Sequence, residues 1–152
     1  MLAFAAALSI AATALAWDQR THRLIAGLAV GALPASPLKD FLSRNETRLE
    51  YFAVEPDRIR GRAEKSRHYI DLEVYGADPI SKLDPDEAAM EREWGAMTLR
   101  ESGSLPWTIE SRANELSQAW RRGDCAEALR LSGYLAHYLG DASQPLHTTK
   151  YF

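Results

Sequence analysis

The sequence predicts an all-α fold, a single-domain bundle of about five to six helices. Three observations support this class. Apolar residues recur at helical spacing in almost every periodic segment, and several of these segments begin with a cap residue followed by proline. No run alternates strongly enough to predict a strand or a hairpin. At 152 residues, the chain is long enough for one hydrophobic core.

Three helices are predicted in the first third of the chain. The first covers residues 21–33 and ends before Pro34. Its apolar positions are Leu24, Ile25, Leu28 and Ala29. Ser36 is a typical N-cap and is followed by proline, so a second helix is expected over 37–44. A third short helix is expected over 46–54.

The remaining segments alternate between irregular and helical. Residues 57–84 are less regular, and we expect 68–72 to be extended or to form a short turn. A capping-box pattern at 84–87 predicts a helix reaching residue 99. The next helix is expected over 106–122, and a second capping box then opens a helix over 124–142.

The first sixteen residues differ from the rest of the chain. Residues 2–16 carry no charge, and Ala14-Leu15-Ala16 matches the small-x-small pattern of a signal-peptidase site. No Lys or Arg precedes the apolar run, which is itself shorter than the ~20 residues of a membrane span. We interpret 1–16 as a signal peptide, so that the mature chain begins at Trp17 and is secreted or periplasmic.

Charge and cysteine content narrow the function further. The formal net charge of −3 provides no global attraction to nucleic acid or to an anionic membrane. Any contact with phosphate must therefore be local, through a metal or a few arginines. The chain has one cysteine, Cys125, which excludes an intrachain disulfide.

The most informative segment is residues 133–147. It places His137 and Asp141 four residues apart, on the same face of the predicted helix, and His147 six residues later, beyond Pro145. Two imidazoles and a carboxylate at one helix end make a suitable ligand set for zinc. Gly133 and Gly140 leave room for other groups, although each costs about 1 kcal/mol of helix propensity.

The other two histidines strengthen this interpretation. His68 lies eleven residues after Asp57 and three before Asp71, and His22 lies five residues after Trp17. A single histidine on a helix is more often a hydrogen-bonded structural residue than a ligand. All four histidines together favour a metal site.

These motifs resemble the zinc-dependent phospholipase C and single-strand-specific nuclease superfamily. The resemblance rests on Gly-x-Leu-x-His-Tyr-x-Gly-Asp-x-x-Gln-Pro-Leu-His around His137, on Trp17 with His22, and on the His-Tyr-Ile-Asp segment 68–71. Gly-Ser-Leu-Pro-Trp at 103–107 is similar to the bacterial members. The resemblance covers residues 17–152.

The resemblance implies a set of metal ligands. One zinc would be held by Asp57, His68, His137 and Asp141. A second would be held by the α-amino nitrogen and carbonyl oxygen of Trp17, with His22 and with Asp141 as a bridge. His147 would be the first ligand of a third.

The resemblance also implies chemistry, in which a metal-activated water hydrolyses P–O bonds in single-stranded nucleic acid, nucleotides or phospholipids. Asp71 matches an aspartate that orients or activates this water, and a supporting or capping carboxylate is an equally good interpretation. Arginines 58, 60 and 62 could meet a phosphate or form a solvated basic turn. Aromatic residues could hold a choline-like cation, stack on bases or pack in the core. These are Tyr51, Phe52, Tyr69 and Trp94.

One departure from the family concerns the third zinc. Family members continue with His-x3-Glu or His-x3-Asp, and here only His147 of that site is present, so we expect the domain to continue beyond residue 152. The alternative function is a non-catalytic zinc-binding helical domain. No stable protein partner is implied, and a monomer is expected.

Overall fold

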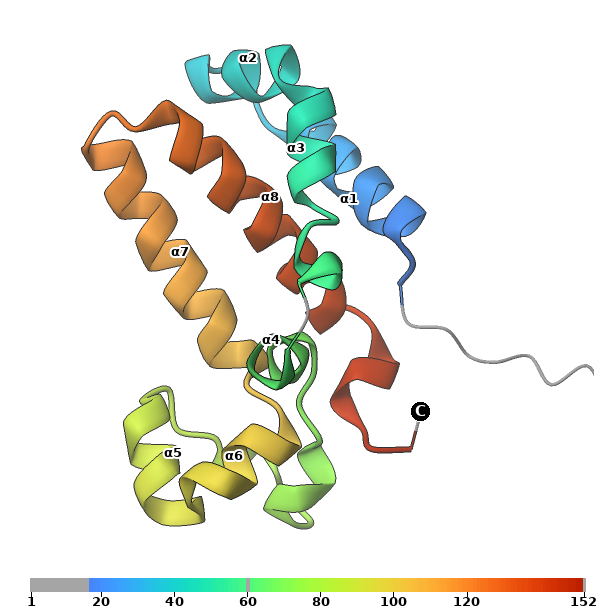
Figure 1. Ribbon diagram of the computed structural model, residues 1–152, viewed down its shortest axis with the longest axis vertical. Coiled ribbons are helices and arrows are strands. Elements are labelled where there is room, and N and C mark those ends of the chain that lie inside the picture. Colours follow the sequence, from blue (N-terminus) through green and yellow to red (C-terminus); the bar gives the residue numbers. More distant parts are fainter. Residues whose placement is uncertain (1–16, 60, 152) are drawn as a thin grey trace, which may run out of the picture.

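Two long helices form the centre of the protein. The computed structural model describes residues 17–59 and 61–151, so the predicted signal peptide and Arg60 lie outside the described part. Helices α7 (Leu105–Arg121) and α8 (Cys125–Ala142) run antiparallel and are joined by a short turn (Figure 1). Asp124 is the N-cap of α8, and its side chain accepts a hydrogen bond from the backbone N–H of Glu127, as the capping pattern predicts.

Three further helices lie beside α8. They are α1 (Gln19–Ala32), α2 (Pro37–Arg44) and α3 (Glu46–Phe52), which lie together at one end of the molecule (Figure 1). Ser36 caps α2 through the N–H of Lys39, with proline at the first position, as predicted. These observations confirm the all-α fold and the positions of the first three helices.

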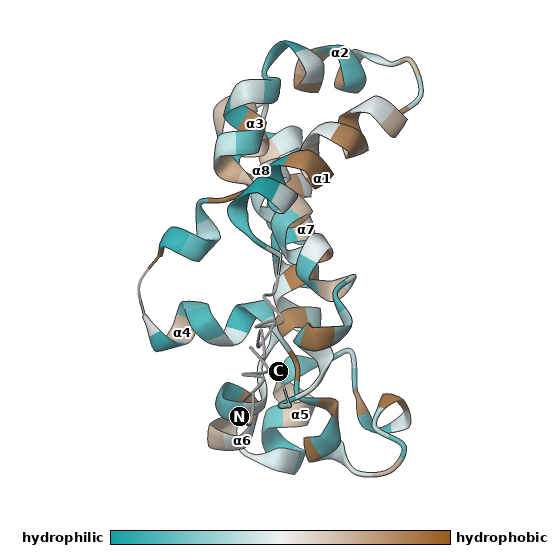
Figure 2. Ribbon diagram, turned by 90° about the vertical axis from the view of Figure 1, so that its right-hand side faces the viewer, coloured by the Kyte–Doolittle hydropathy of each residue, from teal (hydrophilic) through white to brown (hydrophobic). Residues whose placement is uncertain are grey.

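The buried face of α1 differs from the predicted one. Leu24 and Leu28 are 60% and 64% exposed, whereas α1 buries His22, Ala26 and Val30. Hydrophobic and hydrophilic residues therefore both appear along its outer side (Figure 2). The reason is a close approach to α8, because a Cβ added to Gly140 would lie 3.2 Å from Nδ1 of His22. His22 and Ile25 occupy this contact, with Cδ1 of Ile25 3.3 Å from the added Cβ, and Leu24 and Leu28 lie outside it.

The segment between α3 and α7 is built from short turns. In chain order it contains η1 (Pro56–Arg58), α4 (Arg62–Lys65), η2 (Ser66–His68), η3 (Leu72–Tyr75), η4 (Ile80–Lys82), α5 (Glu87–Trp94) and α6 (Ala96–Ser102). The prediction of one helix over 84–99 is therefore wrong in its starting residue and in its continuity. Its N-cap is Asp86, and the chain breaks at Gly95, whose φ of +86° disfavours any residue with a side chain. This break and the short α4 raise the number of α-helices in the described residues to eight.

Close helix packing depends on one of the motif glycines. A Cβ added to Gly133 would lie 2.5 Å from Cβ of Phe52, so α3 touches α8 where only hydrogen fits. The core next to this contact includes Leu49, Ala53 and Leu129. The contact places the end of α3, and the turn that follows it, directly against the motif helix.

The chain leaves α8 through η5 (Pro145–Thr148), as expected from Pro145. Within the described residues, none of the helices combines the length and the apolar character needed to span a bilayer.

Candidate metal centre

His137 and Asp141 lie side by side at the C-terminal end of α8. His137 is fully buried and Asp141 is 1% exposed. Nδ1 of His137 donates a hydrogen bond to the carbonyl oxygen of Ala53 at 2.8 Å, because a carbonyl can only accept. This bond leaves the lone pair on Nε2, which lies 3.3 Å from Oδ2 of Asp141. The one-turn spacing of the motif thus produces the predicted pair.

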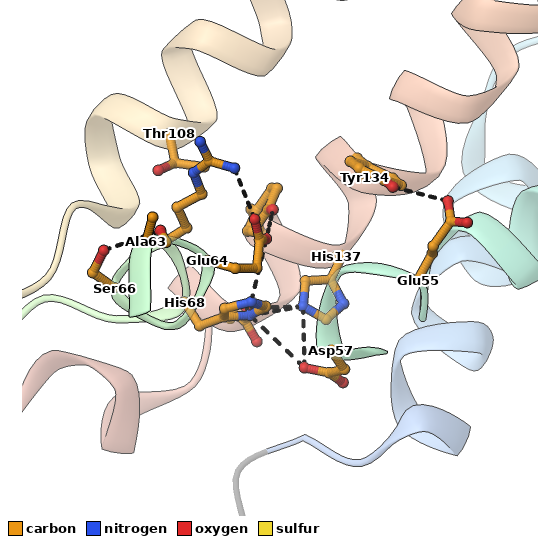
Figure 3. A network of polar contacts seen from close by, with 12 residues as sticks. Glu55, Asp57, Ala63, Glu64, Ser66, His68, Thr108, Tyr134 and His137 are labelled. Carbon is orange, nitrogen blue, oxygen red and sulfur yellow. Dashed lines mark hydrogen bonds and ion pairs between the residues drawn. The ribbon is translucent and has the colours of Figure 1, made fainter. Parts of the chain in front are cut away.

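Two side chains from the 56–68 segment complete this group. His68, at the end of η2, places Nδ1 3.0 Å from Oδ2 of Asp141 and 3.0 Å from Nε2 of His137. Asp57, in η1, places Oδ1 3.6 Å from the same His137 nitrogen and 3.8 Å from the same His68 nitrogen. Figure 3 shows both side chains converging on His137.

The four donor atoms have the spacing of a tetrahedral metal site. Five of the six separations among these four atoms run from 3.0 to 3.8 Å. Ligands about 2.0–2.1 Å from a tetrahedral ion lie about 3.3 Å from one another. The two imidazole nitrogens, 3.0 Å apart, also need a proton or a cation between their lone pairs. His68, His137 and Asp141 could hold a metal ion, and the exposed Asp57 lies beside them.

The second carboxylate oxygen of Asp141 faces two other histidines. Oδ1 lies 3.3 Å from Nε2 of His22 and 3.6 Å from Nε2 of His147. The ring of His22 stacks on that of His137, with centroids 3.9 Å apart. Asp141 therefore stands between two pairs of imidazoles, and the donors of His22, Asp57 and His137 also lie within 4.8 Å of one another.

The electrostatics of the group favour an anionic Asp141. Burial raises the pKa of Asp141, but the interactions with the imidazoles of His137, His22 and His68 outweigh it and hold the pKa well below its usual range. For His68, burial lowers the pKa, yet hydrogen bonds to Asp141 and Glu64 raise it to about 9. Burial lowers the pKa of His147. In the metal-free protein, His68 is therefore the histidine of this cluster that carries a positive charge.

Trp17 reaches the same helix end. Its indole Nε1 donates a hydrogen bond to the carbonyl oxygen of Gly140 at 2.9 Å, one residue before Asp141. The structure therefore brings the start of the predicted mature chain next to the cluster. Coordination by its α-amino group, which requires cleavage after Ala16, stays a prediction.

Asp71 has a different set of neighbours. Its backbone N–H donates to the carbonyl oxygen of Ser102 at 2.6 Å, and burial, with the charge of Glu73, raises its pKa. Within residues 17–59 and 61–151, no hydrogen bond or ion pair joins Asp71 to the donor atoms. Its role in orienting water stays a prediction.

The Gly-Ser-Leu-Pro-Trp motif supports the segment that carries His68. The N–H of Ser104 donates to the carbonyl oxygen of Ser66 at 2.6 Å, and that of Leu105 to Tyr69 at 3.2 Å. Gly103 has φ of +89°, and an added Cβ would lie 2.1 Å from the carbonyl oxygen of Tyr69. The motif therefore sets the backbone on both sides of His68.

A cleft of about 480 Å³ opens beside the cluster. It is lined by Asp57, His68 and His147, by Arg62, Glu64 and Lys65 of α4, and by Tyr69. Of the other predicted substrate-contacting residues, Arg58 donates to Oε1 of Gln19, and its guanidinium lies 5.5 Å from the ring centre of Tyr51. Phe52 and Trp94 pack in the core.

One buried acidic residue was not predicted from the sequence. Glu64 is 6% exposed and lies next to His68 (Figure 3). Burial raises its pKa, but hydrogen bonds from His68 and Tyr138 and the charge of Arg67 hold the pKa at about 2. The signal that could have found it is the four-residue spacing from Glu64 to His68, the same spacing as in the motif helix.

Comparison with protein-family models, with curated proteins and with solved structures finds no match for this chain.

Proposed function

We propose that this protein is a zinc-dependent hydrolase of phosphate esters, secreted or periplasmic and monomeric. The observation that carries the proposal is the group of donor atoms from Asp57, His68, His137 and Asp141, in which five of the six separations are 3.0–3.8 Å. Two imidazoles and two carboxylates at tetrahedral spacing suit zinc better than magnesium or calcium, which prefer oxygen ligands in larger numbers.

A second zinc fits the other side of Asp141. Its protein ligands would be Oδ1 of Asp141, His22 and the α-amino and carbonyl groups of Trp17, with His147 close by. The two carboxylates of Asp57 and Asp141 balance only half the charge of two zinc ions, so the loaded centre is positive. A positive centre attracts a phosphate even though the protein is acidic overall.

The chemistry follows from the ions and from the placement of the side chains. When bound, zinc acts as a Lewis acid, lowering the pKa of water from 15.7 to about 7 and neutralising charge on phosphate oxygens. Ala53 holds His137 in the tautomer that presents Nε2, and burial of Asp141 excludes bulk water from the donor group. The overall reaction adds water across one P–O bond: a phosphodiester yields a phosphate monoester and an alcohol, and a 3′-nucleotide yields phosphate and a nucleoside.

The cleft favours nucleic acid or nucleotides over phosphatidylcholine. Arg62 and Lys65 line it together with Asp57 and His68, and both basic side chains are exposed. Cations in the cleft beside the metal centre would attract the further phosphates of a nucleic acid. Tyr69, Asp57 and Glu64 line the same cleft and are the kinds of residue that a choline head group would use, so phosphatidylcholine is included in the assay.

The proposal is tested by assaying the zinc-loaded protein against single-stranded DNA, a 3′-nucleotide and phosphatidylcholine. We expect hydrolysis of the first two, loss of activity in His137→Ala, and weaker binding of DNA in a double variant, Arg62→Ala with Lys65→Ala. The control is Lys82→Ala, an exposed charge in η4. Turnover of phosphatidylcholine alone would contradict the preference for nucleic acid.

The alternative function is a non-catalytic zinc-binding helical domain. Such a domain would bind zinc through the same donor atoms but would hydrolyse no substrate. Stoichiometric zinc with no hydrolysis of any of the three substrates would favour it.

A further inference from the structure

Glu64 is a buried carboxylate that lies outside the donor group. It stands on α4, one turn before His68, and is 6% exposed. Its oxygens do not face the four donor atoms, since the imidazole ring of His68 separates them: Nδ1 of that ring points to Asp141, and Nε2 points to Glu64. A buried charge costs several kcal/mol unless it is paired and hydrogen-bonded, so its partners matter.

Every partner of Glu64 fixes the carboxylate beside His68. The phenol of Tyr138, on α8 next to His137, donates to Oε1 at 2.5 Å. Nη1 of Arg67 donates to Oε2 at 2.7 Å. Oε1 also lies 3.6 Å from Nε2 of His68. Oε1 is thereby held by Tyr138 of the motif helix and also faces the imidazole of His68, and Oε2 is held by the guanidinium of Arg67.

We propose that Glu64 is a positioning residue for the metal centre: it keeps the proton of His68 on Nε2, so that the lone pair of Nδ1 is presented to the ion. The inference rests on the proposed metal centre. A neutral imidazole can donate from only one nitrogen, and a carboxylate on Nε2 therefore decides which nitrogen is free to bind. The carbonyl of Ala53 does the same for His137 from the opposite nitrogen.

Tyr138 links the two histidines in this arrangement. It follows His137 directly in the sequence, is 1% exposed, and its ring lies 5.4 Å from that of His68. Its hydroxyl orients Glu64, and Glu64 orients His68. The helix that supplies two of the donors thus also fixes, through a phenol and a carboxylate, the orientation of a third donor that lies on a different segment.

The test compares Glu64→Gln with the unchanged protein and with Glu91→Gln, an exposed control on α5. Glutamine has the same shape but lacks the charge and can turn an N–H toward Nε2. We expect Glu64→Gln to weaken zinc binding about 10- to 100-fold by competition with a chelator of known affinity. Glu64→Asp, which keeps the charge, should recover part of the loss, and Glu91→Gln should match the unchanged protein.

A spectroscopic measurement separates positioning from simple stabilisation. In the zinc-loaded protein, ¹⁵N spectra of the imidazoles should show His68 protonated at Nε2, and Glu64→Gln should lose or weaken that signal while His137 keeps its own. Thermal unfolding of the metal-free variants checks that the fold persists. Equal zinc affinity and an unchanged His68 signal in Glu64→Gln would overturn the inference.

His137→Ala distinguishes this failure from failure of the metal centre. If His137→Ala removes about one zinc ion per chain and Glu64→Gln leaves zinc binding unchanged, the centre stands and only the role of Glu64 is wrong. If neither variant alters zinc binding, the centre itself is wrong, and the role of Glu64 is overturned with it.

Discussion

The donors carried by long helices differ from those carried by short turns. His22, His137 and Asp141 lie on α1 and α8 and are at most 1% exposed. Asp57 and His68 lie in η1 and η2, with side chains 34% and 13% exposed. The helical donors are fixed by packing within the bundle, whereas His68 is held by hydrogen bonds from the backbone of Ser104 and Leu105 to Ser66 and Tyr69, on either side of it. The donors on α1 and α8 are therefore held by helix packing, and the donors in η1 and η2 line the cleft.

The largest expected effect comes from the carboxylate that both halves share. Asp141→Asn removes the anionic ligand between the two pairs of imidazoles, so zinc bound after dialysis should fall from about two ions per chain to below about one. Asp57→Asn alters only the first of the two proposed zinc sites, so this variant should lose about one ion. The control is Asp124→Asn, at the N-cap of the same helix, because asparagine caps equally well. Metal analysis by mass spectrometry decides the matter, and full loading of Asp141→Asn would show that this carboxylate binds no metal.

A second prediction concerns the donors that precede α1. A protein beginning at Trp17 should bind about one more zinc ion than the same protein with an added N-terminal Met, because an amide nitrogen is a poor ligand. The free amine has a pKa near 8, so metal must also displace its proton. The group formed by Asp57, His68, His137 and Asp141 should remain loaded in both preparations. Identical zinc content in the two would rule out the amine as a ligand.

The third prediction tests how the turn donors are held. Gly103 and Gly95 have nearly the same backbone, with φ of +89° and +86°, but only Gly103 has a neighbour within reach of an added Cβ. Gly95→Ala should cost about 1–3 kcal/mol of stability from backbone strain alone. Gly103→Ala should cost about 1–3 kcal/mol more from the clash with Tyr69, and should also weaken zinc binding because His68 moves. Chemical unfolding and metal analysis of both variants provide the comparison, and equal behaviour would show that the motif does not support His68.

The helical half of the centre could be predicted from the sequence because its information is local. The spacing of His137 and Asp141 fixes their relation on any helix, and the cap at Asp124 fixes where that helix begins. The prediction for α1 was less complete. The apolar pattern indicated Leu24 and Leu28 as the buried face, but the close contact with Gly140 selected the face that carries His22.

The turn half could not be predicted in the same way. The positions of Asp57 and His68 follow from contacts with residues far away in sequence, such as the hydrogen bond from Ser104 to the backbone of Ser66. Glu64 was missed because a charged residue in an irregular segment usually faces solvent, and only its burial against Tyr138 reveals otherwise. The split of α5 and α6 at Gly95 was likewise hidden by a capping pattern that predicted one continuous helix.

The wide separation of the donors along the chain has a consequence for folding. His22 lies near the start of the described residues and Asp141 near their end, and Asp57 and His68 lie between them. A metal ion held by these residues acts as a cross-link, closing loops that a disulfide cannot close because the chain has a single cysteine. Zinc at about a thousand times its dissociation constant would stabilise the folded state by about 4 kcal/mol. Removing the metal would therefore loosen the contact between the first and last described helices. The melting temperature of the protein would then rise with zinc concentration.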